Sequence, residues 1–296
     1  MRILKHSMMG WSSSTFETYE DTFKKFGGSV NMAPELLKYF MRVNFSTFEF
    51  WHYSLNGIVK AAYFTSNKST IGLNIWNDYP ISYDEIVFPI DRDIKVLLPE
   101  RTSQLSNCLR NNIINSLFYK RKRKVCLIKK EFSGKTVKKR NCELNNLLES
   151  GGEFYCLKDI PPKEIAQLYV YLFNKRFNGS IKCYNKGEIV NLLSNIPNMI
   201  SGHVLFYKNN PCAIDLALKS ESDKNIYIDI PNGGYDPLFA DLSPGSMLMW
   251  KNIVEFQKMS QKHNKEMIIS IGCNDKRWGY KSLWALEHNI GKVMIF

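Results

Sequence analysis

Apolar residues recur along this chain at two spacings, one typical of helices and the other typical of strands. In the first part of the chain, helical spacing predicts helices over residues 15–26, 34–43 and 104–120. Runs rich in β-branched and aromatic residues predict strands over 48–54, 58–64, 70–76 and 123–128. The Asn56-Gly57 pair between the first two strands predicts a hairpin.

The second part of the chain shows a similar order of elements. Helical spacing predicts helices over 135–150, 186–196 and 245–262, and one more that opens at Pro161-Pro162. The predicted strands are 153–157, 203–208, 212–219, 225–230, 267–271 and 293–296. We therefore predict an α/β (α+β) fold of two tandem domains, residues 1–130 and 131–296, each a mostly antiparallel sheet flanked by helices.

Composition excludes several classes of protein. Hydrophobic residues make up 44% and aromatic residues 13% of the chain, which is too much for a disordered protein. No apolar run approaches the ~18 residues of a membrane-spanning helix, and the N-terminus lacks the apolar core of a secretory signal. The seven cysteines are widely spaced without a C-x-x-C pair, which is typical of reduced thiols in a cytoplasmic protein. The five histidines share no metal-ligand spacing and no G-x-S-x-G or Walker motif is present, so we expect neither a metal site nor a serine triad.

The formal net charge of +12 is concentrated in one segment. Eleven Lys or Arg residues and one Glu stand between positions 120 and 140, so this basic belt carries +10 and the remaining chain only +2. A solvated helix end, a nucleic-acid footprint and contact with an anionic membrane surface would each explain the basic belt. Few aromatic residues are interleaved with the basic ones, which disfavours nucleic acid. We rank an anionic membrane surface or an anionic substrate first, with Lys138, Lys139 and Arg140 as candidate contacts.

The start of the helix predicted over 245–262 is a candidate anion-binding site. The run Ser243-Pro244-Gly245-Ser246 puts proline and small residues where a helix exposes unpaired backbone N–H groups at the positive end of its dipole. Such a terminus can hold a pyrophosphate or another anion. Alternatively, Ser243 only caps a buried helix.

A second candidate segment follows the strand predicted over 267–271. In it, Tyr280 can donate a proton, Lys281 can bind a phosphate or carboxylate, and Trp284 can line the same site. Alternatively, the aromatic residues close a core and Lys281 extends its stem along that core toward solvent.

Two runs of the second half resemble a known group of enzymes. SPGSMLMWKNIVEFQ, followed by a strand and CNDKRWGYKSLW, resembles the C-terminal signature of GNAT-like acyltransferases related to the Fem-type aminoacyl transferases. FSGKTVKKRNCELNNLLESGGEF resembles the same proteins, so the likeness covers about residues 132–284. It implies GNAT-like domains and a donor such as acyl-CoA or aminoacyl-tRNA, bound at Ser243, Gly245 and Ser246. The superfamily's pyrophosphate pattern R/Q-x-x-G-x-G/A is not present, and Pro244-Gly245-Ser246 stands in its place.

A closer resemblance reaches both ends of the chain. FGGS (26–29), AAYF (61–64), YPISYDEI (79–86), LLP (97–99) and DIPNGGYD (229–236) are similar to the macrophage-inducible antimicrobial-peptide-resistance (Mig) family of enteric bacteria. This resemblance implies a cytoplasmic protein, peripheral on the inner membrane, that is needed for virulence and for survival against cationic peptides. It implies no particular chemistry.

Acyl transfer to an amine needs a group that accepts a proton and donors that stabilise an oxyanion. Asp229 is the first candidate base and Asp215 the second, although each is alternatively a strand carboxylate that is paired or solvated. We expect the turn Asn232-Gly233-Gly234 to need positive φ. Transfer of an acyl or aminoacyl group to an amine of an envelope precursor or peptide is therefore the first functional hypothesis. A non-catalytic membrane-associated or peptide-binding resistance factor is the second, and a basic DNA-binding regulator is the third.

Overall fold

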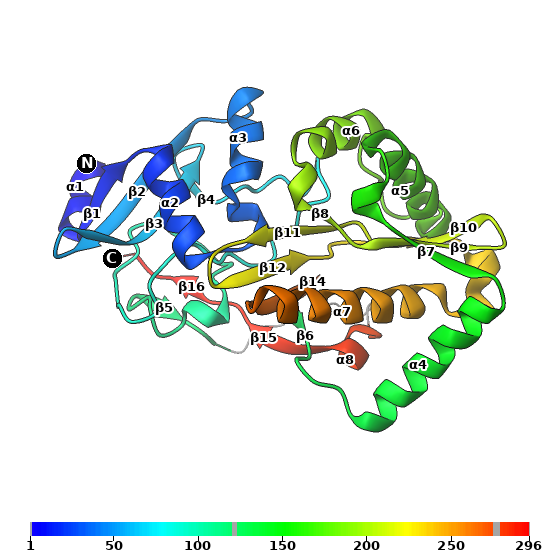
Figure 1. Ribbon diagram of the computed structural model, residues 1–296. Helices are drawn as coiled ribbons and strands as arrows, with labels where there is room; N and C mark the ends of the chain where they lie inside the picture. Colours follow the sequence, from blue (N-terminus) through cyan, green and yellow to red (C-terminus); the bar gives the residue numbers. More distant parts are fainter. Residues whose placement is uncertain (1, 120–122, 275–278, 296) are drawn as a thin grey trace.

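The N-terminal part of the chain forms a four-stranded antiparallel sheet with helices packed beside it (Figure 1). The computed structural model describes residues 2–119, 123–274 and 279–295. The elements of this part are α1 (Arg2–Met8), β1 (Trp11–Ser14), α2 (Phe16–Phe26), η1 (Val30–Met32), α3 (Pro34–Arg42), β2 (Phe48–Leu55), β3 (Ile58–Ser66) and β4 (Thr70–Ile71). The strands are hydrogen-bonded in the order β1-β2-β3-β4. The predicted hairpin is confirmed, because β2 and β3 pair across Asn56 and Gly57, which both have positive φ.

The helix predicted over 104–120 is wrong. Leu105, Leu109 and Ile113 are buried, as their spacing predicts. However, the run contains only a 3₁₀ turn, η2 (Asn107–Leu109), and a short strand, β5 (Ser116–Leu117). The strand predicted over 70–76 is likewise shorter, since only β4 forms.

Buried asparagine side chains explain why this run is not helical. Asn112 Nδ2 donates to the main-chain carbonyl oxygens of Asp91, Arg92 and Ile94 at 2.8–3.3 Å. Asn115 Nδ2 donates to the carbonyl oxygens of Leu98 and Met294 at 2.9 and 2.8 Å. Asparagine side chains that bond the main chain of other segments compete with helical hydrogen bonds. Residues 104–119 therefore form an irregular segment whose asparagine side chains hold the neighbouring loops in place.

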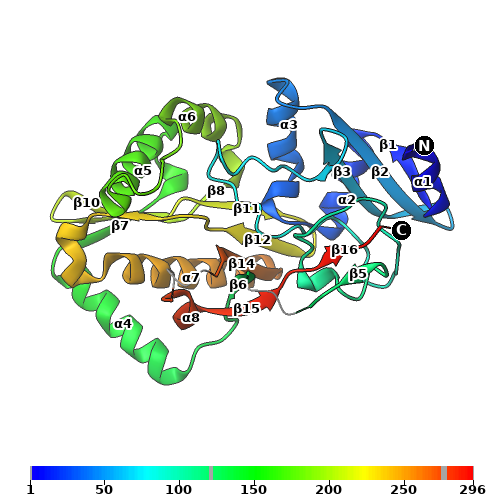
Figure 2. The same ribbon diagram turned by 180° about the vertical axis from the view of Figure 1, so that it is seen from behind.

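The second half contains two sheets between two layers of helices. Its strands are β6 (Lys124–Ile128), β7 (Gly152–Cys156), β8 (Ile200–Ser201), β9 (His203–Tyr207), β10 (Asn210–Ile214), β11 (Ala217–Glu221), β12 (Asn225–Asp229), β13 (Gly234–Tyr235), β14 (Glu266–Cys273), β15 (Ala285–Asn289) and β16 (Lys292–Val293). Its helices are α4 (Gly134–Glu149), η3 (Leu157–Asp159), α5 (Pro162–Phe177), α6 (Lys186–Asn195), η4 (Pro197–Met199), η5 (Pro237–Leu242), α7 (Pro244–His263) and α8 (Lys281–Trp284). The sheet orders are β13-β10-β9-β7 and β15-β6-β14-β12-β11-β8. Helices α5 and α6 lie on one side of these sheets and α7 and α4 on the other (Figures 1 and 2).

The single strand predicted over 212–219 is two strands in different sheets. β10 pairs with β9 and β13, whereas β11 pairs with β8 and β12. Asp215 and Leu216 connect them. The break places Asp215 where the two sheets diverge.

β12, α7 and β14 form a crossover in which the two strands run parallel, from Asn225 opposite Glu266 to Asp229 opposite Ser270. Side chains alternate along β12, so its two faces differ. Ile226 and Ile228 pack in the core cluster of α7. Tyr227 and Asp229 face the first half of the chain instead, where each has a hydrogen-bond partner.

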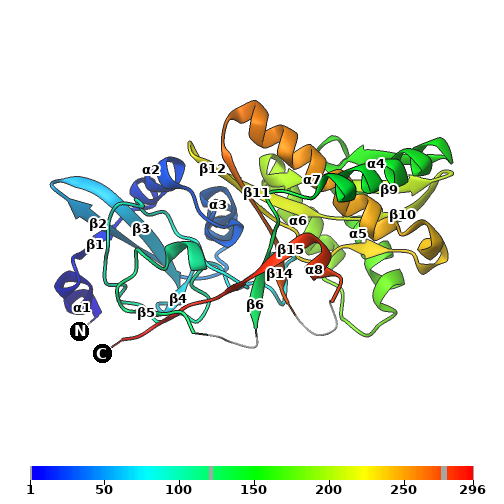
Figure 3. The ribbon, with the colours of Figure 1, turned by 90° about the horizontal axis from the view of Figure 1, so that it is seen from below.

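The two halves share strands and a core. β6, within the residues assigned to the first predicted domain, lies between β14 and β15 of the second half. After β15 the chain returns to the first half, where β16 pairs with β5 (Figure 3). One core cluster contains Phe64 and Ile86 of the first half together with Leu218 and Tyr227 of the second. The predicted α/β class, with mostly antiparallel sheets flanked by helices, is confirmed.

Candidate functional site

A cavity of about 510 Å³ lies at the N-terminal end of α7. Its walls come from the β10–β11 connection, the loop after β12, the start of α7, the end of β14 and α8. The candidate residues that line it are Asp215, Ser243, Gly245, Ser246, Tyr280 and Trp284. The structure therefore brings together residues that the sequence analysis took from three separate segments.

The start of α7 presents polar groups to this cavity. Ser243 has φ of 48°, and its hydroxyl makes no capping hydrogen bond, so it does not act as the side-chain cap considered above. The carbonyl oxygen of Ser243 accepts the N–H groups of Ser246 and Met247 at 2.9 and 3.1 Å. Pro244 has no N–H, and the N–H of Gly245 has no acceptor in the described part of the chain. A β-carbon added at Gly245 would meet nothing within 4 Å, so a ligand can approach this main chain closely.

Asp215 lines the same cavity and belongs to a hydrogen-bonded chain of buried groups. Asn252 Nδ2 donates to Asp215 Oδ2 at 3.1 Å, and His203 Nδ1 lies 2.7 Å from Asn252 Oδ1. Because the amide NH₂ of Asn252 faces a carboxylate, its oxygen accepts from His203, whose proton is therefore on Nδ1. Burial raises the pKa of Asp215 to about 6, against the opposing charge of Arg176 and the Asn252 hydrogen bond. The carboxyl group is thus ionised at neutral pH but holds a proton readily.

Two glycines shape the wall next to Asp215. We expected positive φ in the turn Asn232-Gly233-Gly234, but neither glycine has it. Close approach is the reason for glycine here. A β-carbon at Gly233 would lie 2.2 Å from Asp215 Oδ1, and one at Gly234 would lie 2.5 Å from the main chain of Phe173 on α5. Arg176 Nη1 donates to the carbonyl oxygen of Gly233 at 2.6 Å, which ties this turn to α5.

Apolar side chains close the remaining wall. Trp284 is 2% exposed and packs against Trp250 at 6.4 Å between ring centroids. The guanidinium of Arg140 lies 4.8 Å from the Trp284 ring and donates to Glu143 Oε2 at 2.9 Å. Trp284 is thus part of both the core and the cavity wall. Arg140 stacks on the Trp284 ring and does not line the cavity.

Asp229, the first candidate base, lies outside this cavity. Its Oδ2 accepts the N–H of Ser82 at 3.0 Å, and its Oδ1 has no partner among the described residues. Burial raises the pKa of Asp229 to about 7, and the neighbouring carboxyl groups of Asp84 and Glu85 add to the effect. The adjoining void of about 10 Å³ has room for no more than one water molecule. This placement, at the junction of the two halves, favours a structural role for Asp229.

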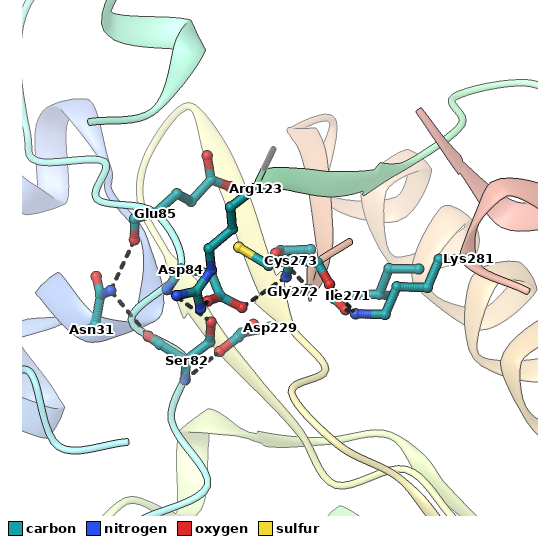
Figure 4. A network of polar contacts seen from close by, with 11 residues as sticks. Asn31, Ser82, Asp84, Glu85, Arg123, Asp229, Ile271, Gly272, Cys273 and Lys281 are labelled. Atoms are coloured by element: carbon teal, nitrogen blue, oxygen red, sulfur yellow. Dashed lines mark hydrogen bonds and ion pairs between the residues drawn. The ribbon is translucent and has the colours of Figure 1, made fainter. Parts of the chain in front are cut away.

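The Lys281 side chain is buried and forms hydrogen bonds with the main chain at the end of β14 (Figure 4). A bulge interrupts the β14–β6 ladder between Ser270 and Cys273, and Gly272 within it has φ of 73°. Lys281 Nζ donates to the carbonyl oxygens of Ile271 and Cys273 at 2.5 and 2.8 Å. Burial lowers the pKa of Lys281. These contacts hold α8 against the end of β14 and favour a structural role over anion binding.

The basic belt spreads over β6, α4 and the loop between them, and its residues 120–122 lie outside the described residues. Acidic partners offset much of its charge. The ion pairs are Arg123–Asp84, Lys124–Glu287, Lys130–Glu266, Lys139–Glu143 and Arg140–Glu143. Lys138 is exposed and has no ion pair within the described ranges. Contact of the belt with a membrane or nucleic acid stays a prediction.

Asn252, His203 and Arg176 are not among the site residues predicted from the sequence. Asn252 stands four residues after Leu248 and four before Phe256, so helical spacing puts it on the buried face of α7. A buried asparagine needs partners for its amide, and this was the signal available in the sequence. His203 and Arg176 had no such signal, because their roles depend on which segments meet in space.

Two negative findings complete the description of the site. Among the described residues, no three His, Cys, Asp or Glu side chains are grouped so that they could hold a metal ion. The helices within the described ranges include none that combines the length and the apolar character needed to cross a membrane.

Solved structures with the same fold include FemX, which matches with a TM-score of 0.60 at 8% identity over 97% of this chain and 98% of that chain. A conserved protein of unknown function from Bacteroides thetaiotaomicron matches with a TM-score of 0.50 at 10% identity, over 97% of this chain and 100% of that chain. A tandem GNAT protein from the clavulanic acid biosynthesis pathway gives a TM-score of 0.44 at 6% identity, over 95% and 97% of the two chains. At these identities, the likeness to FemX and to the Bacteroides protein shows the fold alone.

Among curated proteins, none matches this sequence. The Mig-14 family model, in contrast, matches residues 33–293 and so extends through both halves of the structure. This match confirms the family resemblance drawn from the short runs near both ends. The chain belongs to the Mig-14 family.

Proposed function

We propose that this protein transfers an acyl or aminoacyl group to an amine in the cavity at the start of α7. One observation carries the proposal: the N–H of Gly245, which has no acceptor among the described residues, and the buried carboxyl group of Asp215 line the same cavity of about 510 Å³. An anion site and a proton acceptor in one cavity are what amine acylation by a phosphate-containing donor requires.

The residues around Gly245 fit the phosphate portion of acyl-CoA or of the acceptor end of aminoacyl-tRNA. The Gly245 N–H and the hydroxyl groups of Ser243 and Ser246 would hold a phosphate oxygen at the positive end of the helix dipole. The apolar wall with Met249, Ile271 and Trp284 would receive the acyl chain. The open space at Gly245 supports this fit although the superfamily's glycine pattern is not present.

Asp215 would accept the proton that the amine loses as its nitrogen bonds to the carbonyl carbon of the donor. The bond from that carbon to the donor sulfur or oxygen then breaks, and Tyr280 on the same wall would give a proton to the leaving atom. Asn252 would keep the Asp215 carboxylate oriented through the 3.1 Å hydrogen bond. His203 stays neutral near pH 7 because burial lowers its pKa.

Thermal protection by the donor tests the proposal. We expect acyl-CoA or aminoacyl-tRNA to raise the melting temperature of the wild-type protein, since a ligand that binds only the folded state stabilises it. Gly245→Asp should remove this protection, because it puts a negative charge at the anion site without a steric clash. Gly134→Asp is the matched control, since Gly134 opens α4 and also has nothing within 4 Å of an added β-carbon. A wild-type protein that neither donor protects at saturating concentration would contradict the proposal.

We further propose that this transfer contributes to resistance against cationic peptides and to virulence, and that the protein acts at the cytoplasmic face of the inner membrane. The resemblance to macrophage-inducible resistance proteins supports the biological role, and the exposed Lys138 and Lys139 on α4 support contact with anionic lipid. Sedimentation with vesicles should require anionic lipid and weaken with salt. Lys138→Gln/Lys139→Gln should reduce binding more than Lys163→Gln/Lys182→Gln, which removes the same charge from α5 and from the connection between α5 and α6. Indifference of the wild-type protein to lipid charge would contradict the membrane contact.

A further inference from the structure

A second cavity, larger than the one at α7, lies at the junction of the two halves. Its volume is about 740 Å³, within the ~300–1,000 Å³ common for small-molecule sites. Its walls are the segment around β4, residues 83–84 and 101–104, Arg123 just before β6, and the C-terminal residues 292–295. The N–H of Val293 donates to the carbonyl oxygen of Thr102 at 2.9 Å, which fixes the C-terminal segment beside the first half.

The wall of this junction cavity carries hydrogen-bond donors that have no partner in the part of the chain that the structure describes. Arg101 and Lys292 are exposed, and the side chain of neither has an ion pair or hydrogen bond with any residue in the described ranges. The side-chain amide of Asn74 is likewise unpartnered within those ranges. Gln104 Oε1 accepts the N–H of Ser103 at 3.1 Å, which leaves the NH₂ group of Gln104 as a donor.

The carboxylate that lines this cavity is already bound (Figure 4). Asp84 forms an ion pair with Arg123, and its Oδ2 accepts the N–H of Cys273 at 2.8 Å. Asp84 and Arg123 therefore neutralise each other, while the charges of Arg101 and Lys292 have no acidic partner among the described residues. Two cations and several donors without partners in the described ranges favour a ligand that is anionic and rich in acceptors.

The junction cavity is separate from the cavity at α7. The two share no lining residue. The bulge at the end of β14 lies between them, because Ile271 lines the α7 cavity while Cys273 is bonded to Asp84 of the junction cavity. A ligand here therefore makes contacts that the proposed transfer reaction does not need.

We propose that the junction cavity binds a polar organic molecule that carries a phosphate or diphosphate group, held by Arg101 and Lys292. A guanidinium binds phosphate oxygens in pairs, and a lysine ammonium adds a compact charge. The donors of Asn74 and Gln104 suit further oxygen atoms of the ligand, and Trp76 and Tyr83 line the same wall. The binding site stands whether or not the α7 cavity performs acyl transfer.

Titration of the full-length protein with pyrophosphate, followed by calorimetry, tests the site. Arg101→Gln/Lys292→Gln should weaken binding ~10-fold or more, since the two cationic side chains that hold the phosphate oxygens are both lost. Lys163→Gln/Lys182→Gln removes the same charge from exposed positions outside the cavity and should leave affinity nearly unchanged. Asn74→Trp, which fills the cavity from an exposed position, should also abolish binding. Citrate at equal concentration should compete poorly, and equal competition by citrate would contradict the proposed preference for phosphate.

Each other result would overturn the proposal. Equal weakening in the two double variants would show non-specific attraction by net charge. If Gly245→Asp loses pyrophosphate binding and Arg101→Gln/Lys292→Gln does not, pyrophosphate binds at the start of α7. That result would support the proposed transfer reaction and contradict the proposed junction site. Unchanged binding in Arg101→Gln/Lys292→Gln and Asn74→Trp, or no binding to the wild-type protein, would exclude the junction site, and donor protection at α7 would be unaffected by that outcome.

Discussion

Two buried aspartates, Asp215 and Asp229, differ in what their carboxyl oxygens face. Burial raises the pKa of both, to about 6 and about 7. Asp215 opens onto a cavity and is oriented by Asn252, whereas Asp229 faces a void no larger than a water molecule. A raised pKa is therefore compatible with a catalytic role for Asp215 and with a structural role for Asp229. The difference between them is the volume of the space that each carboxyl group faces. Asp229 was the first candidate base predicted from the sequence. Strand alternation shows which side chains share a face of the strand, but it does not show which other segments pack against that face.

Replacing Asp215 should separate donor binding from turnover. We expect Asp215→Asn to keep thermal protection by the donor, because an asparagine side chain has nearly the same shape and can still accept the hydrogen bond from Asn252. We expect the same variant to lose ~100-fold or more of the transfer rate, because it has no carboxylate to accept the proton. The wild-type rate should rise with pH up to about 6 and then level, as the carboxyl group loses its proton. Steady-state rates with a primary amine acceptor between pH 5 and 8 measure this. A variant with an unchanged rate or an unchanged pH profile would exclude Asp215 as the base.

Replacing Asp229 should stabilise the protein at high pH. Its pKa is raised from 3.8 to about 7, so the folded state holds a proton that the unfolded chain has released. The contribution of this group to the free energy of unfolding therefore falls as pH rises from about 4 to 7. We expect Asp229→Asn to be more stable than wild type at pH 8, by ~1–3 kcal/mol, and the difference to shrink at pH 5. Urea unfolding at both pH values measures it, with the exposed Asp223→Asn as control, and a pH-independent difference would contradict the argument.

At the scale of elements, local signals predicted most helices and strands, and long-range contacts decided the exceptions. The caps, the prolines and the Asn56-Gly57 turn lie next to the elements they define, so a single sequence reveals them. The helix predicted over 104–120 failed because apolar spacing fits any segment that buries every fourth residue, and partners from elsewhere hold Asn112 and Asn115. The division between β10 and β11 was hidden in one apolar run, although it creates the cavity at Asp215. The candidate site was thus predictable as three segments but not as an arrangement.

Gly202 packs against the connection between β10 and β11, where only a glycine fits. It precedes β9 with φ of 92°, and an added β-carbon would lie 2.2 Å from the carbonyl oxygen of Asp215. We expect Gly202→Ala to lower the free energy of unfolding by ~2–4 kcal/mol, since both the backbone conformation and the close approach oppose a side chain. Gly134→Ala, at the open start of α4, should change stability by less than ~1 kcal/mol. Chemical denaturation of both variants tests this, and similar effects of the two changes would contradict it.

At the scale of the whole molecule, the two halves are not independent bodies joined by a linker. β6 lies inside the sheet of the second half, β16 returns to pair with β5, and one core cluster crosses the junction. The sequence could not show this, because strand pairing between distant segments leaves no periodic signal in either segment. The cavity at α7 therefore belongs to the second half, whereas the junction cavity exists only where both halves and the C-terminal segment meet.

This sharing predicts how fragments behave. A fragment of residues 131–296 lacks β6, so β14 and β15 each lose a partner and expose an unpaired edge in the middle of the sheet. A fragment of residues 123–296 keeps β6 and the full six-stranded order. We expect the longer fragment to unfold more cooperatively and to stay monomeric at higher concentration, as measured by circular dichroism melting and light scattering. If the fragment of residues 131–296 equals the longer one in both measurements, then β6 is dispensable to the second sheet, and the boundary predicted at residue 130 separates folding units despite the strand order.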